Sequence, residues 1–112
     1  MNESIRTYDI AREYTPYPAG RYKKNGPGSG EGFREILKEE LDKSDKIRLV
    51  MDGTYGYGSS FLEEAFGGLV REHVLSANEI EKRLVFDTAD ELLRSEIKGY
   101  IADAAKVAAQ DK

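Results

Sequence analysis

Two short apolar runs, each preceded by a helical stretch, constrain this chain more than any other feature of its sequence. Residues 47–51 and 84–86 are rich in aliphatic and aromatic side chains, which is typical of strands buried in a parallel sheet. Apolar side chains also recur at helical spacing in residues 33–41, 61–74 and 92–105. The alternation predicts an α/β fold with a mixed, mostly parallel sheet and about three main helices.

The N-terminal part of the predicted sheet is open to two interpretations. Residues 5–10 mix β-branched and aromatic side chains with polar ones, which predicts an edge strand, parallel or antiparallel to the rest. Two prolines and a glycine follow in residues 14–20, so residues 21–24 could return as a second strand and close a hairpin. No linker or repeat interrupts the chain, so we expect residues 1–112 to form a single domain.

Local signals in the predicted helices bear on how they pack. Gly67 and Gly68 fall in the middle of the second helix, where each glycine costs roughly 1 kcal/mol against alanine. That cost predicts a close approach to a neighbouring backbone or a break in the helix. Ser76 and Glu79 form a capping-box pattern, which predicts a further short helix before Arg83.

Composition excludes several classes of function. The chain has no cysteine, and its one histidine is His73, so thiolate and histidine-rich metal sites are excluded and a serine–histidine triad is improbable. The net charge of −4 gives no basic field for nucleic acid or anionic lipid. No apolar run is long enough to span a membrane, and the first residues do not resemble a secretion signal. We therefore expect a cytoplasmic domain without metal, cofactor, nucleic acid or membrane contact.

The first candidate site is the glycine-rich loop at residues 26–32. It could hold an anion at the start of a helix, with Arg21 beside Gly28, Ser29 and Gly30. The loop matches neither a dinucleotide-binding nor a Walker pattern. A plain connector capped by Ser29 is therefore the favoured interpretation.

The second candidate site begins the helix at residues 60–74. Ser60 and Glu63 fit a capping box, which by itself explains both residues. The same geometry exposes a serine hydroxyl where a phosphate group would meet the positive end of the helix dipole, so Ser60 and its neighbour Ser59 are candidate phosphorylation sites. The pair Glu63 and Glu64, like Glu39–Glu40, is expected on a solvated helix face.

Tyrosines gather in the loops and suggest a protein-binding surface. Without a basic groove beside them, loop tyrosines are expected to contact protein rather than nucleic-acid bases. The candidate partner-binding residues share a position in or just after the second glycine-rich loop: Tyr55, Tyr57, Ser59, Ser60, Phe61 and Glu64.

The run from Met51 to Val70 resembles the signature of the STAS-like domain family of unknown function, with its Ser-Ser-Phe-Leu-Glu-Glu-Ala-Phe-Gly-Gly-Leu stretch at residues 59–69. The segments 20–22 and 29–34 are similar to the same family's glycine-rich region. The resemblance spans about residues 4–105, which we take as the domain core, and it implies a STAS-like α/β fold.

STAS domains mediate protein–protein contacts, and in anti-sigma-factor antagonists a serine after the central strand is phosphorylated by a histidine-kinase-like ATPase. The resemblance places that serine on Ser60. Gly58 stands where those proteins have an acidic residue, and residues 61–63 replace their Gly-Leu-Gly. The resemblance implies a non-enzymatic signal-transduction module with a histidine-kinase-like ATPase as its candidate partner. The alternative is a small-molecule or nucleotide sensor at loop 26–32, and a homodimer through the edge strand stays open.

Overall fold

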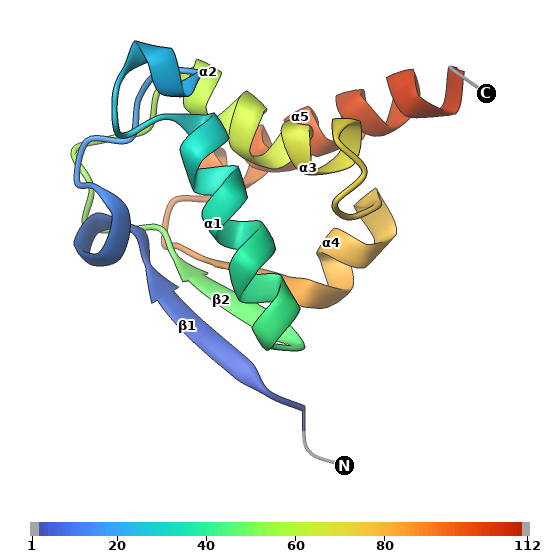
Figure 1. Cartoon of the computed structure of the whole chain (residues 1–112), viewed down its shortest axis with the longest axis horizontal. Coiled ribbons are helices and arrows are strands. Elements are labelled where there is room, and N and C mark those ends of the chain that lie inside the picture. Colours follow the sequence, from blue (N-terminus) through green and yellow to red (C-terminus); the bar gives the residue numbers. More distant parts are fainter. Residues whose placement is uncertain (1–2, 111–112) are drawn as a thin grey trace.

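The computed structural model describes residues 3–110, and its centre is a three-stranded parallel sheet. Strands β1 (Ile5–Asp9), β2 (Lys46–Val50) and β3 (Leu84–Asp87) lie side by side in chain order. Figure 1 shows β1 and β2 next to each other below helix α1 (Gly30–Lys43). The predicted edge strand and parallel sheet are confirmed. Strand β1 pairs parallel to β2, so the antiparallel alternative is wrong. The hairpin is also absent from the described residues, because a 3₁₀ turn, η2 (Lys23–Asn25), occupies its predicted second strand.

The helices follow the predicted stretches, with two differences. Helix α1 spans Gly30–Lys43, and α5 spans Glu91–Gln110. The second predicted helix consists of α2 (Ser59–Leu62), a π-helical turn η3 (Glu63–Gly67) and α3 (Gly68–Arg71) in one continuous segment. Helix α4 (Ala77–Arg83) adds to the three main helices expected, and a short π-helical turn, η1 (Ile10–Tyr14), follows β1.

Among residues 3–110, the helices cover one face of the sheet and leave the other exposed. Ile47, Leu49 and Leu84 are buried against the helices, whereas Arg48 and Val85 on the opposite face are exposed. Strand order explains this asymmetry. Successive right-handed crossovers that advance in one direction place every connecting helix on the same side of a parallel sheet.

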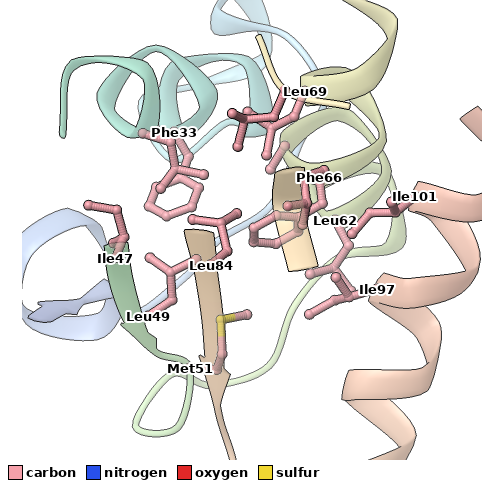
Figure 2. Close-up of a cluster of buried hydrophobic side chains, with 14 of the residues drawn as sticks. Phe33, Ile47, Leu49, Met51, Leu62, Phe66, Leu69, Leu84, Ile97 and Ile101 are labelled. Atoms are coloured by element: carbon pink, nitrogen blue, oxygen red, sulfur yellow. The ribbon is translucent and has the colours of Figure 1, made fainter. Parts of the chain in front are cut away.

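The core lies between that face and the helices. Phe33 of α1 and Phe66 of η3 are fully buried, with ring centroids 6.1 Å apart in an edge-to-face arrangement. Ile97 of α5 closes the core from the other side of η3 (Figure 2). Burying each such side chain contributes roughly 1.5–3 kcal/mol, so this cluster fixes how α1, η3 and α5 pack on the sheet.

The two adjacent glycines mark the predicted break in the helix, and the close approach that they allow is mainly to side chains rather than to a neighbouring backbone. The π-helical turn ends at Gly67, so the regular helix is interrupted there. A Cβ atom on Gly68 would lie 2.5 Å from Nη1 of Arg34, and one on Gly67 would lie 2.7 Å from Oε2 of Glu63. The close approach therefore involves mainly charged side chains, which belong to the site described below.

Across residues 3–110, every helix is too short or too polar to cross a lipid bilayer.

Candidate functional site

The two glycine-rich loops predicted as separate sites are both hydrogen-bonded to residues 15–22, which precede them in the chain. Near the start of this segment, the Tyr55 N–H donates to the Pro16 carbonyl at 2.9 Å. Near its end, the Gly30 N–H donates to the Gly20 carbonyl, also at 2.9 Å. Main-chain hydrogen bonds therefore hold both loops against one segment.

A stacked pair of tyrosines stands at the exposed centre of this assembly. The rings of Tyr17 and Tyr55 have centroids 4.8 Å apart and planes only 4° from parallel. The two residues are nevertheless 63% and 80% exposed. Residues 15–22 and 53–60, with this pair at their centre, are called the loop platform below.

The other loop tyrosines divide between the platform and the core. Tyr22 is 44% exposed and extends the platform. Tyr57 is half-buried, its hydroxyl donates to the Met51 carbonyl at 2.6 Å, and burial raises the pKa of its phenol. Tyr14 is also half-buried and donates to the Ser29 carbonyl at 2.7 Å. Tyr57 therefore supports the platform from beneath, although the sequence hypothesis placed it on the partner surface.

Ser59 and Ser60 begin α2 with exposed side chains. The N-cap residue is Gly58, and no side chain forms a capping hydrogen bond there. The capping box predicted from Ser60 and Glu63 is therefore wrong, because Ser60 already lies inside the helix and the Glu63 carboxylate binds arginines instead. Both serines are therefore exposed residues at the end of the loop platform.

Two other predicted contact residues face the interior. Phe61 is fully buried, with its ring centroid 5.8 Å from that of Phe33, and Glu64 is only 5% exposed. Both lie on the side of the helical segment that packs against α1. Their assignment to a partner surface is corrected, since neither presents a side chain to solvent.

Glu63 and Glu64 bind three arginines from different segments. Glu64 accepts from Arg34, and its other carboxylate oxygen lies 3.1 Å from both Arg21 and Arg71. Glu63 pairs with Arg21 and lies 2.8 Å from Arg71. The prediction of a solvated acidic face is wrong for this pair. These five residues are called the arginine–glutamate cluster.

Ion pairing within the cluster favours the charged forms of Glu63 and Arg21. Burial alone raises the pKa of Glu63, but the hydrogen bonds from Arg71 and Arg21 more than offset this and hold that pKa below its usual value. The hydrogen bond to Glu63 likewise raises the pKa of Arg21. Three guanidinium groups against two carboxylates leave one formal positive charge.

The first glycine-rich loop does not offer the donors that an anion would need. The N–H groups of residues 30–33 already bond to the Gly20 and Arg21 carbonyls and to the carbonyl and hydroxyl of Ser29. Ser29 is 1% exposed and caps α1, as the connector interpretation predicted. Arg21 is engaged in the cluster. The contacts therefore do not support the anion-binding alternative at this loop.

Close packing explains two of the glycines there. A Cβ atom on Gly30 would lie 2.5 Å from the Phe61 carbonyl oxygen, and one on Gly28 would lie 3.0 Å from the Tyr17 carbonyl oxygen. Both neighbours are main-chain atoms that cannot swing aside. The glycines bring α1 and the loop close to other backbone, which is a structural requirement.

Sequence reasoning counted Tyr17 among the loop tyrosines but not among the candidate partner-binding residues, and it assigned no site role to Arg34 or Arg71. Tyr17 lies between Pro16 and Pro18, whose rings restrict the backbone, and that is a local signal for a fixed, displayed side chain. The two arginines carry no comparable signal, because their carboxylate partners lie on other turns or other elements.

The sheet itself lacks one common type of ligand site. Doubly wound sheets bind nucleotides where the strand order reverses, beyond the carboxyl ends of the strands. The order β1-β2-β3 has no reversal among the described strands. Asp52, just past β2, accepts from the Thr88 hydroxyl at 2.5 Å and the Ala89 N–H at 3.0 Å, which joins the ends of β2 and β3.

Comparison with known families gives one match. The model of the STAS-like domain of unknown function matches residues 29–93, which include α1, the second glycine-rich loop and the arginine–glutamate cluster except Arg21. No curated protein and no solved structure matches the chain significantly. Because the match covers more than half of the residues, the chain belongs to the STAS-like domain family of unknown function.

Proposed function

We propose that this protein is a non-enzymatic regulatory module that binds a protein partner through the loop platform. Membership of a STAS-like family suggests a regulatory or interaction module. The observation that carries the proposal is the exposed Tyr17–Tyr55 stack. Tyrosine combines a large apolar area with a polar hydroxyl, and it is enriched among residues that dominate binding energy.

The rigidity of the platform supports this role. Ordering a loop upon binding costs free energy, and a surface that is already ordered avoids that cost. Here the Tyr55 and Gly58 N–H groups bond to the Pro16 and Pro18 carbonyls, so both tyrosines are displayed on fixed backbone.

The site gives little support to an enzymatic role, because the one histidine of the chain lies far from its exposed serines. The exposed serine hydroxyls of the loop platform belong to Ser59 and Ser60. His73 lies beyond the opposite end of the same helical segment, about 20 Å away at the usual helical rise. It is therefore out of reach as a general base for either serine.

The finer proposal is that phosphorylation of Ser60 or Ser59 controls binding, with a histidine-kinase-like ATPase as the partner. A phosphate group would add about two negative charges at the rim of the platform. One turn along the helix, Glu63 would repel it less than a lone carboxylate, since it is paired with Arg21 and Arg71. The added charge would oppose a partner whose docking surface fits the unphosphorylated platform.

The interaction is tested with Tyr55→Ala and a purified histidine-kinase-like ATPase from the same genome, using titration calorimetry. Loss of a central aromatic residue typically costs at least about 2 kcal/mol, so binding should weaken by about 30-fold or more. Leu92→Ala is the matched control, because Leu92 is 83% exposed on α5 outside the platform. Equal affinity of Tyr55→Ala and wild type would remove the platform from the interface.

The switch is tested separately by incubating the protein with the ATPase and ATP and mapping phosphate by mass spectrometry. We expect modification of wild type at Ser60 or Ser59, its loss in the corresponding alanine variant, and weaker binding of Ser60→Glu. An unmodified protein that still binds the ATPase would contradict the switch while leaving the interaction module intact.

A further inference from the structure

The tyrosines of this chain differ in what their rings contact. Three of them pack against phenylalanine rings at the core: Tyr8, Tyr14 and Tyr57. Within residues 3–110, only Tyr17 and Tyr55 place one tyrosine ring on another, and both are mostly exposed. In the same part of the chain, tyrosine hydroxyls form hydrogen bonds at other positions and not at these two. The pair therefore presents two phenol groups, face to face, to molecules in solution.

Tyrosine is the side-chain type of this protein that is most open to one-electron oxidation. The chain has no cysteine and no tryptophan, which are the other side chains that readily lose single electrons. Met51, which an oxidant would attack at sulfur, is fully buried. An oxidant in solution therefore meets exposed phenols first. A phenol that loses one electron and its hydroxyl proton becomes a phenoxyl radical.

The stacked rings have the geometry in which two such radicals join. The unpaired electron of a phenoxyl radical occupies π orbitals perpendicular to the ring, and it is shared with the carbons beside the C–O bond, Cε1 and Cε2. A bond forms between two rings where these orbitals point at each other, which requires nearly parallel planes. The planes of Tyr17 and Tyr55 differ by only 4°, and the ring centroids are 4.8 Å apart. The Cε carbons carry hydrogen atoms that can leave afterwards, so coupling there restores both aromatic rings.

The backbone keeps the two rings together before any reaction. The Tyr55 N–H donates to the carbonyl of Pro16, the residue before Tyr17, at 2.9 Å. Pro16 and Pro18 also restrict the chain on both sides of Tyr17. Two reactants held in position react faster than two free ones, because they need no diffusional encounter. Coupling within one chain is therefore expected to outpace coupling between two molecules.

We propose that Tyr17 and Tyr55 form an oxidative cross-linking site, at which hydrogen peroxide and a haem peroxidase produce a dityrosine that ties the two loops of the platform together. Each phenol gives up one electron and one proton, and the peroxide that accepts them becomes two water molecules. The two radicals then form a bond between a Cε carbon of Tyr17 and a Cε carbon of Tyr55. The hydrogen on each joined carbon leaves as a proton, and each phenolic oxygen takes up a proton. The protein loses two hydrogen atoms in total.

The cross-link has a consequence that does not depend on a partner. It closes a loop of chain from residue 17 to residue 55, which restricts the unfolded state more than the folded one. The midpoint of thermal unfolding is expected to rise by roughly 10 °C. The inference therefore goes beyond the proposed function and does not rest on it.

The test treats the purified full chain with a haem peroxidase and hydrogen peroxide. We expect a monomer that is lighter by two hydrogen atoms, dityrosine fluorescence, and a proteolytic fragment in which Tyr17 is joined to Tyr55. Tyr17→Phe and Tyr55→Phe each keep the ring but lose the hydroxyl, so neither should give a cross-linked monomer. Tyr22→Phe is the matched control, because Tyr22 is 44% exposed on the same platform, and it should react like wild type.

Repeating the reaction at several protein concentrations separates the two modes of coupling, since the yield within one chain does not change on dilution. The inference is overturned if no dityrosine forms, if it joins mainly different molecules, or if either phenylalanine variant still gives a cross-linked monomer. A cross-linked monomer that unfolds at the same temperature as the untreated protein would also overturn it. No partner takes part in this reaction, so its failure leaves the binding test of the proposed function unaffected.

Discussion

The dipeptide Glu-Glu occurs in two helical segments of this protein, with opposite outcomes. Glu39 on α1 is exposed, and its neighbour Glu40 forms one ion pair with Arg6 at 3.1 Å. Glu64 is 5% exposed and, with Glu63, binds three arginines. Sequence pattern alone predicts the same solvated face for both pairs. The difference shows that the surroundings of a carboxylate depend on which distant residues the fold brings to it.

Those distant residues are the three arginines of the cluster. Arg21 comes from the loop platform, Arg34 from α1 and Arg71 from the end of α3. The cluster thereby connects the platform to two helices of the core. A buried carboxylate with several arginines is costly to disrupt, because removing it leaves charges without partners.

The largest expected effect is that of Glu64→Ala. Removal of one partner from a buried ion pair typically costs about 3–5 kcal/mol, and Arg34, whose side chain is 12% exposed, would lose its carboxylate. Urea unfolding followed by circular dichroism measures the free energy of unfolding. Glu39→Ala is the matched control and should change it by less than about 0.5 kcal/mol. Equal effects of the two variants would show that burial does not distinguish the two acidic pairs.

A smaller effect is expected from Gly30→Ala, which tests the packing that buries Glu64. The new methyl group would meet the Phe61 carbonyl oxygen at 2.5 Å and the Glu64 Cβ atom at 3.0 Å. Overpacking of this kind costs about 1–3 kcal/mol in the free energy of unfolding. Gly99→Ala on α5 has no atom within 4 Å of its Cβ position and should instead stabilise the protein by about 0.5–1 kcal/mol. A neutral Gly30→Ala would mean that α1 does not need its close approach to the helical segment.

The smallest effect concerns acid pH and Glu63. Burial favours the neutral form of this side chain, but Arg71 and Arg21 hold its folded pKa below the ordinary value of 4.5. A lowered pKa stabilises the folded state above about pH 4.5, and this contribution is lost as the pH falls through the folded pKa. Glu63→Gln should therefore show a smaller loss of stability between ~pH 7 and ~pH 3.5 than wild type.

Unfolding at both pH values measures that difference, with Glu72→Gln as an exposed control near the end of the same helical segment. An unchanged pH dependence in Glu63→Gln would indicate that its carboxylate is not held ionised by the arginines.

Much of the fold could be predicted because its signals are local. The apolar runs of β2 and β3 carry their own strand pattern, and Ser76 with Glu79 caps α4 as the capping box predicts. Ser29 caps α1 in the same way. A cap or a strand pattern depends on residues within a few positions of one another, so a single sequence contains it.

The candidate site could be predicted only in outline. Loop tyrosines and exposed serines follow from local composition, and Tyr55, Ser59 and Ser60 are indeed exposed. The partner of Tyr55 in the stack, Tyr17, is 38 positions away, and nothing in either loop specifies that contact. Local sequence also does not determine which way Phe61 faces, because a residue near the start of a helix can face either solvent or the core. In the fold it is fully buried.

By itself the sequence determined where the three strands and the main helices form, and it placed serines and tyrosines in the loops between them, since hydrophobic spacing, glycines and caps act over a few residues. Tertiary structure alone decided that Glu64 is buried while Glu39 is not, and that Arg21 binds Glu63 and Glu64. Those outcomes depend on contacts between residues tens of positions apart, and such contacts exist only after the segments have packed together.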